Sequence, residues 1–154
     1  MDSLPEIPDD WTATERWVWT RICAGQVADL SERDDEAREL DASQADGWEA
    51  DRRLRVDFLQ TILTRKAFVE RTPYGGVRIL GALVDDAPLH LDHGRLPHAL
   101  FLMRCRVLVA VQCEHLRVDG PLSFEGSWMG ASTNLFGVQV RDGMDLSAGT
   151  FREK

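Results

Sequence analysis

Apolar and polar residues alternate along the chain in a pattern that repeats every eleven residues from Leu89 onward. Each repeat holds two apolar pairs, and the two members of a pair flank one residue that is mostly polar. The pairs begin at Leu89, Gly94, Leu100, Cys105, Val111, Leu116, Leu122, Ser127, Thr133, Val138, Met144 and Gly149. Such short in-out-in triplets predict very short β-strands, because a helix would need apolar spacings of three and four.

A fixed repeat of short strands predicts a solenoid, since one unit cannot bury its own apolar row. Two repeats make a four-sided coil of 22 residues, in which residues 22 apart stack about 4.8 Å apart. The expected inward ladders are Leu100–Leu122–Met144, Leu102–Phe124–Leu146 and Leu96–Val118–Val140. Corners such as Asp119-Gly120-Pro121 have suitable turn chemistry. The fold expected for residues 77–151 is therefore a short right-handed quadrilateral β-helix of about three coils.

The first unit of this β-helix is less regular. Its apolar pairs, Val77/Ile79 and Ala82/Val84, match the others only if one extra residue precedes Leu89. Counting 22 without that residue places Ile79 outward beneath Phe101, where we expect the helices to cover both side chains.

Two helices are expected before the solenoid. Thr12 and Glu15 form a capping box that predicts a helix from Ala13 to Ala24, with Gly25 as a left-handed stop. An apolar stripe predicts a second helix over about 48–66, after an acidic surface loop at 29–47 with a possible helical turn at 37–40. The helices should cap the first coil, whose edge would otherwise meet water. The expected organisation is a loose lead-in (1–10), a helical cap (11–72) and the β-helix (73–154).

The net charge of the chain and its distribution argue against one class of partner, nucleic acid. Of the net −8, residues 1–76 carry −7 (17 acids, 10 bases) and residues 77–154 carry −1 (9 acids, 8 bases). An acidic chain is poorly suited to binding nucleic acid through its phosphates. Neither a membrane span nor a signal peptide is expected from the hydropathy pattern. Three cysteines, two of them at inward positions, indicate reduced thiols in a cytosol.

Several segments resemble a known family. They are Gly75-Gly76-Val77-Arg78-Ile79-Leu80-Gly81-Ala82, Ala87-Pro88-Leu89-His90-Leu91, Gly120-Pro121-Leu122-Ser123-Phe124-Glu125-Gly126-Ser127 and the Arg- and Leu-rich stretch 52–63. The chain resembles the pentapeptide-repeat-like right-handed β-helix proteins of bacteria, in particular a group often labelled "membrane-associated oxidoreductase". The resemblance implies a bacterial, cytoplasmic β-helix protein, and the label implies a redox enzyme, for which the sequence offers no cofactor motif.

Some pentapeptide-repeat proteins mimic DNA towards topoisomerases, which requires rows of acidic residues along the coil faces. The coils here are nearly neutral and should expose Arg95, Arg106 and Arg117, so the sequence argues against this alternative. We expect a non-catalytic binding or scaffold protein that acts through protein contacts.

Few residues suggest catalysis or a cofactor. His90, His93 and His98 could suggest a metal site, but the coil pattern separates them by corners, and solvated surface histidines are the favoured interpretation. Cys113 and His115 could suggest a thiol–imidazole pair, but Cys113 is expected to point inward. We therefore expect no catalytic, cofactor-binding or metal residues.

Two outward groups are candidate partner-binding sites. Arg95 and Arg117 stack 22 apart with Gln139 next in the row, and Arg106 stacks with Trp128 on another face. The second pair is either a surface cation–π contact or an aromatic–arginine anchor for a partner. A homodimer is expected through the last coil, with Met144, Leu146 and Phe151 at a tail-to-tail interface, because its apolar rungs have no following coil.

Overall fold

The structure, a computed structural model, describes residues 7–30, 52–73, 75–141, 143–145 and 150–151. Its helices are α1 (Ala13–Cys23), α2 (Val56–Thr64) and α3 (Lys66–Val69). Its strands are β1 (Ala28–Asp29), β2 (Val77–Leu80), β3 (Leu83–Val84), β4 (Leu89–His90), β5 (Arg95–Leu96), β6 (Leu100–Met103), β7 (Arg106–Val107), β8 (Val111–Gln112), β9 (Arg117–Val118), β10 (Leu122–Ser123), β11 (Trp128–Met129), β12 (Thr133–Asn134), β13 (Gln139–Val140), β14 (Met144–Asp145) and β15 (Thr150–Phe151).

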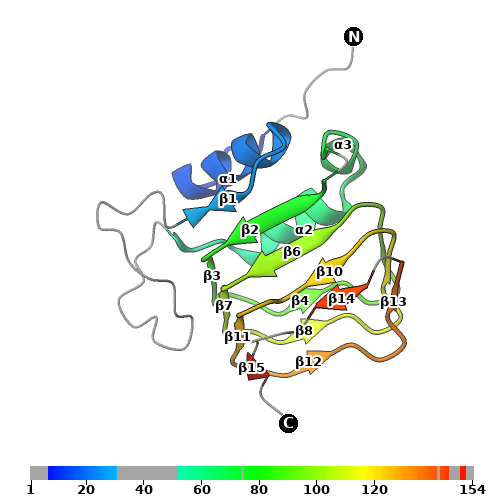
Figure 1. The fold of residues 1–154 in the computed structure, drawn as a ribbon. Coiled ribbons are helices and arrows are strands. Elements are labelled where there is room, and N and C mark those ends of the chain that lie inside the picture. The colour runs from blue at the N-terminus through cyan, green and yellow to red at the C-terminus, as the bar shows by residue number, and fades with distance from the viewer. Residues whose placement is uncertain (1–6, 31–51, 74, 142, 146–149, 152–154) are drawn as a thin grey trace.

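These strands form four parallel sheets, one for each side of a β-helix (Figure 1). The strand orders are β1-β2-β6-β10-β14, β15-β11-β7-β3, β12-β8-β4 and β13-β9-β5. Leu89 pairs with Val111, which pairs with Thr133, so successive coils follow each other with the period that the sequence predicts. The predicted parallel β-helix of about three coils is confirmed.

The predicted inward ladders are confirmed wherever the structure describes them. Leu100 pairs with Leu122 and Leu122 with Met144, while Leu96 pairs with Val118 and Val118 with Val140. In the third ladder Leu102 and Phe124 are both buried, and Leu146 lies outside the described residues. The alternation therefore predicts the core, because in a strand it directly sets which side chains leave water.

The extra residue expected in the first coil lies between Val84 and Leu89. The step along the chain from Val84 to its partner Val107 is one residue longer than the step from Leu89 to its partner Val111. One consequence corrects the sequence analysis: Ile79 pairs with Leu102 and is fully buried, and Arg78 rather than Ile79 pairs with Phe101. The outward stacking of Ile79 on Phe101 was wrong because a shift of one residue exchanges the two faces of a strand.

The first predicted helix is confirmed as α1. The hydroxyl of Thr12 accepts a hydrogen bond from the Glu15 backbone N–H, and the Glu15 carboxylate accepts one from Thr12. The chain leaves the helix through Gly25, whose φ is +74°. It then forms β1, which pairs with β2 and covers the edge of the largest sheet (Figure 1). This strand was not predicted, and the acidic loop expected from residue 29 therefore starts too early. Residues 31–47, which include the helical turn expected at 37–40, lie outside the described residues.

The second helix is shorter than predicted. Residues 52–55 are not α-helical, and residues 48–51 lie outside the described part of the chain. Arg53 forms a β-bridge with Leu83, and the Leu54 backbone N–H donates to the Leu83 carbonyl at 2.9 Å. Asp86 then accepts the backbone N–H of Val56, the first residue of α2, at 3.0 Å. Residues 53–55 are extended because they cover the open edge of β3, and this tertiary contact cannot be predicted from the helical pattern of the sequence.

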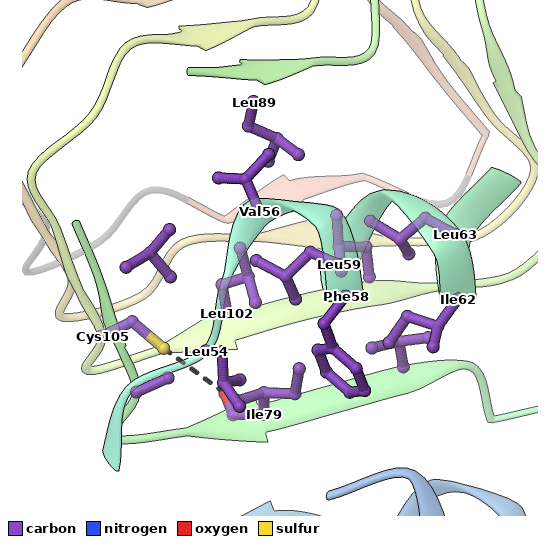
Figure 2. Close-up of a cluster of buried hydrophobic side chains, with 14 of the residues drawn as sticks. Leu54, Val56, Phe58, Leu59, Ile62, Leu63, Ile79, Leu89, Leu102 and Cys105 are labelled. Carbon is purple, nitrogen blue, oxygen red and sulfur yellow. Dashed lines mark hydrogen bonds between the residues drawn. The ribbon is translucent and has the colours of Figure 1, made fainter. Parts of the chain in front are cut away.

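Helix α2 closes the apolar interior of the first coil. Figure 2 shows Val56 next to Leu89, with Leu59, Ile62 and Leu63 in the same buried cluster. Helix α1 joins the cap through aromatic contacts: the ring centroid of Trp11 lies 4.7 Å from that of Phe58, and those of Trp19 and Phe68 lie 5.2 Å apart. The helices thus form the cap that a terminal repeat requires.

Candidate partner-binding faces of the β-helix

The sheet β5-β9-β13 carries a row of polar side chains on its outer face. In each of these two-residue strands the first side chain points outward and the second inward. Arg95 therefore stacks on Arg117, which stacks on Gln139, as the register shows. The predicted row is confirmed, and all three side chains are exposed.

A carboxylate at the following corner organises this row. Oδ2 of Asp119 accepts from Nε of Arg95 at 2.6 Å and lies 2.5 Å from its Nη2. Nε of Arg117 approaches Oδ1 of the same carboxylate at 3.4 Å. The Arg95 guanidinium, with a smaller contribution from Arg117, holds the pKa of Asp119 below its usual range. The sequence analysis named both arginines and missed Asp119, although the coil period places its corner beside them.

A shallow groove adjoins the row. Its volume is about 360 Å³, and it is lined by Arg117, Val118, Asp119, Gln139, Val140 and Arg141. Among the described residues, Arg95, Arg117 and Arg141 bring three positive charges to this face, and Asp119 brings one negative charge. These side chains together are electropositive, on a chain whose net charge is −8. Below, "the arginine face" means Arg95, Arg117, Asp119, Gln139 and Arg141.

The second candidate pair is also confirmed as stacked neighbours. Arg106 pairs in register with Trp128, and its Cζ lies 5.9 Å from the centroid of the indole ring. Both side chains are half-buried, and Leu108 beside them is 38% exposed. A Cβ at Gly130 would lie 3.2 Å from Nε1 of Trp128, so the indole extends over this glycine.

The two candidate groups lie on different sides of the β-helix. Arg106 and Trp128 belong to the sheet β15-β11-β7-β3, whereas Arg95 and Arg117 belong to β13-β9-β5. Each coil passes through the β4-β8-β12 side between them, so the two sheets are opposite sides of the four-sided coil. One flat partner surface cannot cover both groups.

The cysteines of the β-helix lie in the core. Cys105 and Cys113 are 0% and 1% exposed, as their inward positions predicted. Burial raises the pKa of each thiol to about 12, and the Asp92 carboxylate contributes at Cys113. Sγ of Cys105 contacts the carbonyl oxygen of Met103 at 3.4 Å. It also contacts that of Ile79 at 3.9 Å, as Figure 2 shows. Both thiols are therefore protonated at neutral pH and have no thiolate to act as a nucleophile.

The three histidines considered as metal ligands do not converge. His90 points outward from β4, His93 occupies the next corner, and His98 borders a small crevice beside α2 and α3. Among the residues that the structure describes, no three His, Cys, Asp or Glu side chains form a group suited to a metal ion.

His93 is instead stacked on a fourth histidine. Its ring centroid lies 5.3 Å from that of His115, with 24° between the ring planes. Both residues occupy left-handed corners, with φ of 57° and 56°. His115 in turn contacts Phe136 edge-on at 5.4 Å and covers Gly137. Sequence reasoning missed this stack, although His93 and His115 are separated in the sequence by one coil.

The residues expected at a dimer interface are only partly described. Met144 pairs with Leu122 and is 39% exposed, although it continues an inward ladder. Phe151 pairs with Met129 through the backbone, and Leu146 lies outside the described residues. The inward residues Leu135, Val138 and Val140 of this coil are half-buried, unlike their counterparts in the preceding coils.

Comparisons of the chain with protein-family models, with curated proteins and with solved structures found no match in any of the three. Over the described residues, the helices are too short or too polar to cross a bilayer.

Proposed function

We propose that this chain is a non-catalytic binding or scaffold protein that contacts a protein partner through the outer surface of its β-helix, with the arginine face as the contact site. The observation that carries the proposal is the convergence of Arg95 and Arg117 on Asp119 beside the groove. Arginine is a frequent contact residue in protein interfaces, and an arginine fixed in place loses less side-chain entropy on binding.

The side with Arg106 and Trp128 is the second candidate contact site. A half-exposed tryptophan beside an arginine and the exposed Leu108 is the combination often found at the centre of interfaces. We favour the arginine face, because the cation–π contact already engages both members of the Arg106–Trp128 pair. Arg117 and Gln139, by contrast, line an open groove.

The family and the cellular compartment expected from the sequence, and the judgement on the two alternative functions, are part of the same proposal. The length of the coil supports membership of the pentapeptide-repeat-like proteins, and the reduced, buried cysteines support a bacterial cytoplasm. A redox enzyme is the alternative that the family label implies, and the sequence offers no cofactor motif for it. DNA mimicry is disfavoured by the arginines at outward strand positions, and failure to inhibit gyrase supercoiling is the expected result.

Site-specific photo-crosslinking in the native cell tests the contact site. We would place p-benzoylphenylalanine at Gln139 and, as a control, at His90, which is exposed on a different sheet. The proposal expects a discrete crosslinked protein from position 139, absent from position 90 and lost when Arg117→Gln is added. The same products from both positions, or none from position 139, would show that this face does not contact a protein.

We also propose that the chain pairs with a second copy through its last coil. Met144 and Phe136 are 39% and 68% exposed there, and among the described strands β12, β13 and β14 each pair on one side only. An apolar surface with unpaired strand edges favours association.

A further inference from the structure

The arginines of the arginine face differ in the number and the length of their contacts with Asp119. Arg95 directs both Nε and Nη2 at Oδ2, at 2.6 and 2.5 Å. Arg117 places only Nε near this carboxylate, at 3.4 Å. Arg141 makes no ion pair with any of the described residues. With respect to the described residues, the donors left for a ligand therefore belong to Arg117 and Arg141, and both of these residues, but not Arg95, line the groove.

The shape of the groove indicates what kind of anion it suits. Two guanidinium groups border it, and each can bind a planar carboxylate through two parallel hydrogen bonds. Gln139, between them, can both donate to and accept from a peptide backbone. Val118 and Val140 also line the groove, but their side chains point inward, so it is mainly the polar residues that face a ligand. A shallow groove over neighbouring strands fits an extended segment better than a small molecule enclosed on all sides.

The net charge of the whole chain also restricts which kind of anionic partner can bind in the groove. At physiological salt the Debye length is about 8 Å, so the acidic groups of a chain with net charge −8 repel mainly those phosphates of a bound nucleic acid that lie within about this distance of them. A short segment with a few carboxylates meets much less of this repulsion while still reaching the local positive charge.

We infer that Arg117, Gln139 and Arg141 form a binding site for Asp or Glu side chains of an extended acidic segment in a protein partner. Asp119 anchors Arg95 and approaches Nε of Arg117, which leaves the two terminal nitrogens of Arg117 outside this contact with the carboxylate. This inference rests on the proposed function and adds the chemistry of the partner.

Fluorescence anisotropy with defined probes tests the inference on the full chain. A fluorescein-labelled hexaglutamate peptide, at about 50 mM salt where screening is weak, is compared with hexaglutamine and with a single-stranded oligonucleotide of equal charge. Hexaglutamate should bind best, and Arg117→Gln and Arg141→Gln should each weaken it about tenfold or more. Arg104→Gln is the matched control, because it removes the same charge from an exposed corner between β6 and β7, outside both candidate contact sites.

Several results would overturn the inference: no hexaglutamate binding at millimolar protein, equal binding of hexaglutamine, tighter binding of the oligonucleotide, or an equal loss with Arg104→Gln. Thermal melts of each variant show whether it is folded. If hexaglutamate does not bind but the crosslink from position 139 persists, the contact site stands and only the acidic chemistry of the partner is wrong.

Discussion

At the scale of the residue, inward positions carry the stability of the β-helix. Phe124 is 1% exposed inside a narrow coil. Phe124→Ala should lower the free energy of unfolding by about 3–5 kcal/mol, because the coil cannot collapse around the space that is left. His90→Ala, at an outward position, should change it by less than about 0.5 kcal/mol. Urea denaturation measures both, and equal losses would contradict the assigned register.

Ser127 is a polar residue at an inward position, and its hydroxyl links two coils. Oγ donates to the carbonyl of Leu102 at 2.6 Å and accepts the backbone N–H of Cys105 at 3.0 Å. Ser127→Ala would leave both buried groups unpaired, so we expect a loss of about 1–3 kcal/mol in the free energy of unfolding.

Ser123→Ala is the control for this prediction, because Oγ of Ser123 accepts a local hydrogen bond from the backbone N–H of Glu125, two residues along the chain. Its loss should be the smaller of the two in the same urea measurement. A Ser127→Ala variant as stable as the wild type would show that water replaces the hydroxyl.

At the scale of the element, the turn into the first strand depends on a glycine. Gly76 has φ of +79°, and a Cβ on it would lie 2.2 Å from the carbonyl oxygen of Ala99. Gly25, with φ of +74°, has open space around it. Gly25→Ala should cost about 1–2 kcal/mol for its left-handed backbone alone. Gly76→Ala should cost more, because the backbone of Ala99 must also move; equal thermal shifts would contradict this contact.

The cap is joined internally by a buried carboxylate. Glu15 is fully buried, and its oxygens accept three contacts from the Arg55 side chain at 2.7–3.2 Å and one from its backbone N–H at 2.9 Å. Burial alone would raise the pKa of Glu15, but the hydrogen bonds from Arg55 and Thr12 outweigh it and lower the pKa.

This ion pair predicts a dependence of stability on pH. Because the pKa of Glu15 is lower in the folded state, its contribution is fully present above the unfolded pKa of about 4.3 and is lost as the pH falls through the folded value. Glu15→Gln should therefore destabilise the chain at pH 7 and flatten the loss of stability below about pH 5.

Melting temperatures measured between pH 3 and 7 test this prediction. Glu70→Gln, which removes an exposed partner 3.8 Å from Lys66, is the control and should leave the profile nearly unchanged. A Glu15→Gln profile parallel to that of the wild type would contradict the role assigned to Glu15.

At the scale of the whole molecule, the last coil determines the expected assembly. We predict a tail-to-tail dimer of the full chain at tens of micromolar, measured by sedimentation velocity. Met144→Asp should produce a monomer, because it places a charge on the exposed apolar end. Leu108→Asp, at a similarly exposed position on one side of the second coil, should leave the dimer intact. A monomeric wild type, or a dimer that survives Met144→Asp in a folded chain, would refute the prediction.

The sequence by itself determined the coil. The eleven-residue alternation, the ladder from Leu100 to Met144 and the stacking of Arg106 with Trp128 all follow from local periodicity, because a parallel β-helix places residues one coil apart on top of each other. The capping box at Thr12 could also be predicted from the sequence, because it involves only residues close together in the chain.

Tertiary structure alone decided how the cap meets the coils and what surrounds the candidate site. Residues 53–55 belong to the predicted helix but are extended, because the open edge of β3 needs a partner. The Glu15–Arg55 pair joins residues 40 positions apart, and no periodic pattern in the sequence predicts it. The contact between Asp119 and Arg95 could not be predicted from the sequence. It depends on the length and direction of the Asp119 side chain at the corner, and not on its sequence spacing alone.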